Sequence, residues 1–310
     1  MGSRISLLLL LMPTLTSASE AFRITVVEPT GVLRSGWPVT SGVPFAAGEL
    51  LSADAVSLRR SGPSGPAVPL QTEILSRWPD NSIRWLLLDF QVDLKPAQRQ
   101  EFTLFYGKDV TRRHVDQPIT ISDGYEGMTV DNGLLKVHLD RDNFRPLQSI
   151  WLDGNADRAY ADNERLTDGH GPGIVLTAPD GSIFQAHRTR MRTRVEQRGP
   201  LRACIRLEGK HQGKNGHLLG YVARLHIFRG RPFVRFDYTF VNDNTPRMVS
   251  AVKSLELGIS LAGKGPFQRH LQGPQKETAR LFQLDDRQFH LNGQPGGRQA
   301  AGWVSLSGTR

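Results

Sequence analysis

Hydrophobic and polar residues alternate with a period of two along much of the chain, which is typical of β-strands with one buried face. The clearest example is the segment 134–140, whose sequence is LLKVHLD. Segments of this kind are short and are separated by clusters of Gly, Pro, Asn and Asp, which favour turns. The pattern predicts an all-β protein.

The N-terminal part, residues 22–106, is predicted to form a small β-barrel, because short strands alternate there with Gly- and Pro-rich turns and no 3.6-residue period is present. Trp85 lies in an almost continuous apolar run and is expected in the core, whereas Trp78 could lie in the core or be exposed for stacking on a sugar ring. The polar segment 107–127 is expected to be an interdomain linker. The expected strands of the barrel are 22–28, 56–59, 68–75, 83–90 and 101–106.

The remainder, residues 128–310, is predicted to form a large antiparallel β-sandwich, because strands of about ten residues follow one another through hairpin turns. A last strand-like segment, 301–306, is followed by only four residues. We therefore expect the sandwich to be incomplete or to lack a C-terminal partner domain. The expected long strands are 184–196, 201–208, 218–228, 232–242 and 252–261.

The first 19 residues predict a secretory signal peptide, with Arg4 before five consecutive leucines and small residues up to Ser19. The alternative is an N-terminal helix that stays attached to the protein. No apolar run approaches the roughly 20 residues that a transmembrane helix needs, so no stable membrane anchor is expected after signal removal. The predicted location is secreted or periplasmic.

The net positive charge of the chain indicates which kind of partner to expect. The chain has 39 Lys and Arg against 30 Asp and Glu, a formal net charge of +9. For a secreted protein this excess favours an acidic polysaccharide or an acidic C-terminal domain as partner, and no nucleic acid. The single cysteine, Cys204, excludes an intramolecular disulfide and is expected to be structural rather than nucleophilic. No metal-binding or nucleotide-binding motif is present, so neither a metal nor a cofactor is expected.

Arginine recurs with the strand period between residues 188 and 194, so these side chains are expected on one face of a strand. The expected hairpin places Arg194 beside Arg202 and Arg190 beside Arg206. A guanidinium pairs well with a carboxylate, so this face could bind an acidic polymer. The alternatives are an ordinary solvated sheet face or a face docked on an acidic domain. The candidate substrate-binding residues are Arg188, Arg190, Arg192, Arg194, Arg202 and Arg206.

Three stretches resemble a known family: VTSGVPF and GEL within residues 39–50, VPLQ followed by RWPDNSIRWLLLDF within 68–90, and VDNGLL at 130–135. Together they resemble the exo-rhamnogalacturonan lyase and YetA-like family. The resemblance implies an N-terminal small barrel, a central β-sandwich, a C-terminal helical toroid, and β-elimination on an acidic pectic polysaccharide such as rhamnogalacturonan.

No segment of this chain matches the helical toroid. We therefore expect the chain to be the non-catalytic N-terminal part of a secreted lyase-like protein and to be inactive alone. The alternative is a stand-alone secreted carbohydrate- or polyanion-binding β protein without turnover.

No catalytic residue is assigned, because a uronate lyase needs a base, an acid and a cation that stabilises the enolate, and no spacing groups such residues here. His226 alternates in phase with Arg224 and is expected to be an ordinary histidine of a sheet face. The glycine-rich segment 168–173 could line a cleft or form a plain turn. The residue types that could serve are His138, His170, His187, His226, Tyr160, Tyr221 and Tyr238.

Overall fold

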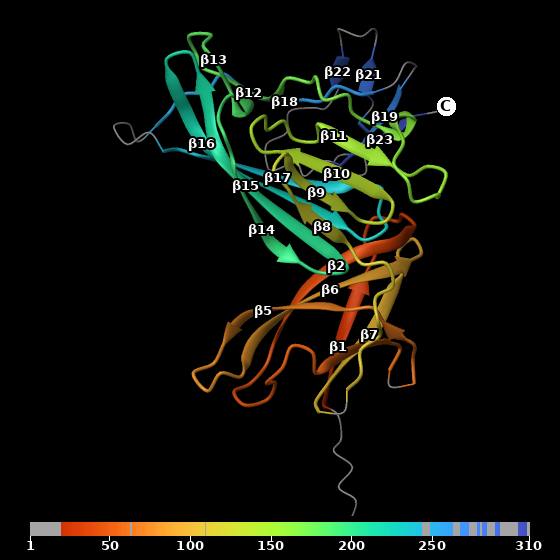
Figure 1. Ribbon diagram of the computed structural model, residues 1–310. Coiled ribbons are helices and arrows are strands. Elements are labelled where there is room, and N and C mark those ends of the chain that lie inside the picture. The colour runs from red at the N-terminus through yellow and green to blue at the C-terminus, as the bar shows by residue number, and fades with distance from the viewer. Residues whose placement is uncertain are drawn as a thin grey trace, which may run out of the picture. The chain divides into compact units, whose positions relative to one another are not determined.

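The computed structural model describes residues 20–62, 64–108, 110–243 and 249–262, together with the backbone of short strands between 267 and 308. The predicted signal peptide lies outside the described residues. The secondary structure is nearly all β, which confirms the predicted fold class (Figure 1). Within the part of the chain that the structure describes, no helix combines the length and apolarity needed to cross a bilayer.

The chain divides into two units, one formed by residues up to 28 and 33–116 and the other by residues 29–32 and 117–310. The first unit is a small barrel of two antiparallel sheets, with strand orders β1-β7-β3-β4 and β2-β6-β5. Apolar residues of both sheets, such as Leu58 and Leu88, form one core. Its strands are β1 (Glu20–Val27), β2 (Arg34–Pro44), β3 (Val56–Arg60), β4 (Ala67–Val68), β5 (Gln71–Arg77), β6 (Ile83–Leu94) and β7 (Arg99–Tyr106).

Trp85 does not lie in the core as expected, because its side chain is 40 % exposed. The pairing of β5 with β6 changes register at Ser76, opposite Trp85, and such an irregularity re-aims side chains that strict alternation would bury. Trp78 is half-buried, and its Nε1 donates a hydrogen bond to the carbonyl of Phe45 at 2.9 Å. The guanidinium of Arg84 lies 4.7 Å from the centroid of the Trp78 ring.

The second unit contains a sandwich of two antiparallel sheets. The small sheet has the order β11-β10-β9-β8, and the large sheet has the order β17-β16-β15-β13-β12-β18 with β14 paired to β15 (Figure 1). Buried residues of both sheets, such as Val137 and Ile205, share one core. The strands are β8 (Thr120–Asp123), β9 (Gly127–Asp131), β10 (Leu135–Asp140), β11 (Ser149–Leu152), β12 (Gly173–Thr177), β13 (Ile183–Gln185), β14 (Arg192–Arg198), β15 (Arg202–Gly213), β16 (Gly216–Phe228), β17 (Val234–Val241) and β18 (Ser254–Gly258).

Strand β8 lies within the segment 107–127, for which we expected a linker, and it pairs with β9. Between residues 267 and 308 the structure describes the backbone of five further short strands. Of these, β20-β19-β23 form one antiparallel group and β21-β22 another. They are β19 (Phe267–Gln272), β20 (Thr278–Ala279), β21 (Leu281–Gln283), β22 (Phe289–Leu291) and β23 (Trp303–Gly308).

The strand expected at 184–196 is interrupted, so this prediction was wrong. A 3₁₀ turn, η2 (Ala186–Arg188), separates β13 from β14. Ala186 and Met191 are both buried in the sandwich core. Two residues five positions apart lie on opposite faces of an extended strand, so the chain must turn to bury both. Arg188 and Arg190 therefore precede β14 and do not share a strand face with its arginines.

Candidate functional site

The outer face of the large sheet carries the predicted arginines of β14 and β15. Along β15, Ile205 and Leu207 enter the core, so Arg206 points outward. The register places Arg194 beside Arg206, and Arg206 beside Arg224 of β16. The prediction that Arg194 lies beside Arg202 and Arg190 beside Arg206 was wrong. The first pair of the hairpin is Arg198 with Ala203, and a β-bulge at residue 196 shifts the register by one more residue, so that Arg194 pairs with Arg206.

Glu196, the extra residue of this bulge, lies among the arginines. It accepts hydrogen bonds from Arg224 Nε at 2.7 Å and from Arg206 Nη1 at 3.2 Å, and Arg194 Nη2 lies 3.4 Å from it. Arg206 also pairs with Glu208. The hydrogen bond from Arg224 is the main cause that lowers the pKa of Glu196 to about 2. The arginines at the centre of this face are therefore already paired with the protein's own carboxylates.

A second polar row on this face joins Arg202, His226 and Asp237. His226 Nδ1 lies 3.1 Å from Arg202 Nη2, and its Nε2 lies 3.1 Å from Asp237 Oδ2. Because arginine can only donate, Nδ1 accepts and the protonated Nε2 donates to Asp237. Burial, aided by the charge of Arg202, lowers the pKa of His226. His226 is thus a neutral, fully hydrogen-bonded histidine of the sheet face.

Cys204, between Arg202 and Arg206 on β15, is buried. Burial is the main cause that raises the pKa of its thiol to about 12, and the nearby Glu196 adds to it. A thiol with this pKa is protonated at neutral pH and is a poor nucleophile, which agrees with the structural role expected from the sequence.

The other predicted arginines face solvent. Arg188, Arg190 and Arg192 are exposed. Arg190 Nε lies 3.4 Å from Asp142 Oδ1, and both side chains are largely exposed, so this pair contributes little stability. Among the described residues, neither Arg188 nor Arg192 has an ion pair. The six candidates therefore divide into three that take part in internal networks, of which Arg194 is itself exposed, and three that lie outside those networks.

The residue types that a lyase would use are dispersed over the described part of the sandwich. Tyr221 and Tyr238 pack in the core, and His226 lies on the outer face of the large sheet. His138 lies in β10 and hydrogen-bonds Thr129, whereas Tyr160 lies in the loop after β11 and hydrogen-bonds Asp131.

The glycine-rich segment 168–173 is a pinned turn. Asp168 accepts hydrogen bonds from the backbone N–H of His170 at 2.8 Å and from Ser260 Oγ at 2.6 Å. A Cβ at Gly171 would lie 2.7 Å from the backbone nitrogen of Ser260, so this position requires glycine. These contacts favour the plain-turn interpretation of the segment.

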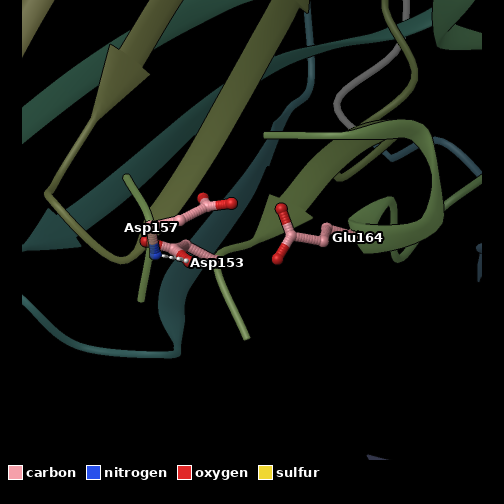
Figure 2. Close-up of side chains that lie close together, drawn as sticks. All are labelled: Asp153, Asp157 and Glu164. Carbon is pink, nitrogen blue, oxygen red and sulfur yellow. Dashed lines mark hydrogen bonds between the residues drawn. The ribbon is translucent and has the colours of Figure 1, made fainter. Parts of the chain in front are cut away.

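Three carboxylates that the sequence analysis did not group come together in the loop after β11. Asp153, Asp157 and Glu164 have oxygens within 4.8 Å of one another (Figure 2). Each of the six carboxylate oxygens accepts an N–H hydrogen bond from the same loop, for example Asp153 Oδ2 from Arg158 N at 2.9 Å and Glu164 Oε1 from Gly154 N at 3.0 Å. The cluster therefore serves to fix the loop, and we assign no metal to it.

A row of basic and aromatic side chains on the outer face of the small sheet was not predicted from the sequence. We call Lys136, Trp151, Tyr160 and Arg165 the cation–aromatic ladder. Lys136 Nζ lies 4.4 Å from the ring centroid of Trp151 and 4.6 Å from that of Tyr160. Arg165 Cζ lies 5.3 Å from the Trp151 centroid. Alternation in the segment 134–140 could have placed Lys136 outward, but Tyr160 and Arg165 come from a loop without a periodic pattern.

Two family models match the chain. Residues 33–104 match the PcRGLX-like N-terminal RIFT barrel domain, and residues 119–283 match the PcRGLX-like protein central beta sandwich domain. The uncharacterized protein YetA of Bacillus subtilis (strain 168) is 27 % identical over 259 residues, which cover 79 % of this chain and 28 % of YetA. The chain thus spans less than a third of that relative's length.

Proposed function

Since the chain belongs to the PcRGLX-like family, which is related to rhamnogalacturonan lyases, we propose that it forms the non-catalytic N-terminal part of a secreted protein that cleaves an acidic pectic polysaccharide, such as rhamnogalacturonan, by β-elimination. The observation that supports this is the match of two successive domains, the barrel and the central sandwich, in the order in which the chain carries them. In this proposal the chain holds the polymer and supports the catalytic part.

The exposed arginines support a polymer-binding role. Arg188, Arg190 and Arg192 present guanidinium groups to solvent, where a carboxylate of a uronate could pair with them bidentately. Arg194, Arg202 and Arg206 act differently, because they already hold Glu196 or His226. The same surface could instead dock an acidic C-terminal domain of the whole protein, which is the other partner that we propose.

The test is binding and turnover by the purified chain. Rhamnogalacturonan is titrated into the protein in a calorimeter, with the carboxyl-reduced polymer as the matched neutral ligand. We expect binding to the acidic polymer, much weaker binding to the reduced polymer, and no unsaturated product by ultraviolet absorbance. Product formation would show that the chain is catalytic, and absence of binding would refute the polymer-holding role.

A stand-alone carbohydrate- or polyanion-binding protein without turnover is the second candidate, favoured by the exposed cations rather than by the domain match. The intact mass of the native secreted protein separates the two. A mass near that of this chain favours the stand-alone protein, and a mass two or three times larger favours the lyase-like protein.

A further inference from the structure

We propose that the cation–aromatic ladder is a binding site for the carboxylate of a hexuronate residue within an acidic polysaccharide. The choice of a sugar acid rests on the proposed function, whereas the position of the site rests on the geometry of the small sheet. This site lies on a different sheet from the predicted arginine face.

The ladder is built by cross-strand neighbours. Lys136 of β10 pairs with Asp131 of β9 on one side and with Trp151 of β11 on the other. An isolated bridge places Arg165 on the far side of Trp151. Side chains at directly paired positions share one face of a sheet, so the basic and aromatic groups form a row across the strands. Tyr160 completes the row by covering the ammonium of Lys136.

The two cations of the ladder lack a carboxylate partner. Within the described ranges, neither Lys136 nor Arg165 forms an ion pair, although acidic residues are near. Asp131 instead accepts hydrogen bonds from Tyr160 OH at 2.5 Å and from the backbone of Gly133 at 2.8 Å. Asp168 accepts from Ser260 and from its own turn. The arginine face of the large sheet differs, because there Glu196 supplies the anion.

The donors at one end of the ladder are incompletely satisfied. Arg165 Nη2 has only a long contact, 3.4 Å, with Ser149 Oγ, and its Nε is buried without a hydrogen-bond partner among the described residues. A Cβ added at the neighbouring Gly169 would lie 3.3 Å from Arg165 Nη2 and 3.5 Å from Gln148, so a larger residue there would crowd this guanidinium. Arg145 Nη1 donates to the carbonyl of the same glycine at 3.3 Å. A second guanidinium therefore reaches this end of the row.

These features suit a carboxylated sugar. The faces of the aromatic rings attract Lys136 and Arg165 and restrict their motion, but a ring face does not satisfy an N–H donor as an oxygen does. A carboxylate can accept from such positioned donors in a strong, charge-assisted hydrogen bond. The apolar parts of Trp151 and Tyr160 can pack against the C–H groups of a sugar. The cations of the ladder thus match the carboxylate of a uronate, and its aromatic rings match the C–H groups of the sugar.

The experiment compares charge-removing variants in the calorimetric titration with rhamnogalacturonan and its carboxyl-reduced form. Lys136→Gln and Arg165→Gln are each expected to weaken binding about tenfold, because each removes one charged hydrogen-bond donor. Lys214→Gln, an exposed position in the turn between β15 and β16, is the matched control and should bind like the unchanged protein. Circular dichroism verifies that each variant is folded.

A second readout locates the ligand without removing a charge. Binding beside Trp151 should change the tryptophan fluorescence of the unchanged protein. In Trp151→Phe, which keeps a smaller aromatic ring, binding should weaken, and most of the fluorescence change at saturating ligand should be lost. Persistence of the full change would place the ligand elsewhere and would overturn the proposal.

The remaining outcomes are also decisive. If the unchanged protein binds the acidic polymer and both ladder variants bind equally well, the ladder is not the site, although the proposed function stands. If the unchanged protein binds neither polymer, the proposed function fails and the sugar ligand fails with it. If Lys136→Gln and Arg165→Gln weaken binding of inorganic polyphosphate as strongly as binding of the polysaccharide, the surface is a general polyanion site and the assignment to a sugar carboxylate is overturned.

Discussion

Arg224 donates two hydrogen bonds to Glu196, from Nε to Oε2 at 2.7 Å and from Nη2 to Oε1 at 3.1 Å. This bidentate pair explains how Arg194, Arg206 and Arg224 can be neighbours across three strands, although like charges in such positions repel. The anion comes from a bulge residue of the same sheet, so the arginines form a network within the protein before any ligand is present.

We predict that Glu196→Gln lowers the free energy of unfolding at pH 7 by roughly 1 kcal/mol. The expected loss is small because solvent reaches this face and screens the ion pairs of Glu196. The pKa of Glu196 is lowered from 4.5 to about 2, so the contribution of its carboxylate to stability is full above pH 4.5 and is lost as the pH falls towards 2. Urea unfolding at pH 7, 4 and 3 measures this contribution. The difference between variant and unchanged protein should shrink with acidification, and a constant difference would contradict this explanation.

We predict a second pH effect at His226. Folding lowers its pKa below the ordinary value of 6.5, so below pH 6.5 the unfolded chain takes up a proton that the folded chain does not. Stability should therefore fall as the pH decreases from 6.5 towards the folded-state pKa. His226→Gln, which retains a donor and an acceptor for Asp237 and Arg202, should reduce this slope. Thermal melts between pH 7.5 and 5 test it, and an unchanged slope would refute it.

A matched pair of tyrosines tests the polar groups in the sandwich core. His211 Nδ1 lies 2.9 Å from the carbonyl of Leu219 and therefore donates, so its Nε2 accepts from Tyr238 OH at 2.6 Å. Tyr238→Phe leaves this buried nitrogen unpaired and should cost about 1–2 kcal/mol.

Tyr221, stacked on Tyr238 with ring centroids 5.5 Å apart, provides the control. Its hydroxyl is buried without a hydrogen-bond partner among the described residues. Tyr221→Phe should therefore leave the unfolding free energy unchanged or slightly raised, within about 1 kcal/mol. Urea titrations of both variants measure the contrast. Equal losses of unfolding free energy in the two variants would contradict this prediction, because they would show that the hydrogen bond of Tyr238 adds no stability.

We predict that the exposed arginines contribute to polymer binding through charge. Arg190→Ala combined with Arg192→Ala should weaken binding to the acidic polysaccharide severalfold and flatten its dependence on salt, because exposed charges act through screened electrostatics. Calorimetric titrations from 50 to 300 mM salt give both quantities. Unchanged affinity and salt dependence would remove these arginines from the binding surface.

Several elements were predictable because they depend on local pattern. The strand at 56–59 and the alternating segment 134–140 were recognised from period-two alternation and turn residues, and they appear as β3 and β10. The prediction of a single strand at 184–196 failed because the Arg-Thr-Arg alternation there resembles the pattern of an exposed strand. The burial of Ala186 and Met191, which interrupts it, depends on the opposite sheet and leaves no periodic signal.

The sites were less predictable than the strands. Alternation indicated which arginines of β14 and β15 point outward, but their neighbours depended on the turn and on the bulge at Glu196. The ladder joins Lys136 to Tyr160 and Arg165, which lie beyond the next strand in a loop, so only folding brings these groups together.

The sequence by itself determined the all-β class, the order of barrel and sandwich, and the excess of basic residues, because alternation, turn chemistry and charge are local or additive properties. Only the tertiary structure decided that Glu196 pairs with three arginines of the large sheet, that Trp85 is exposed, and that Lys136 and Arg165 flank Trp151 without a carboxylate partner among the described residues. Each of these depends on strand register, and one bulge or one loop changes which side chains become neighbours.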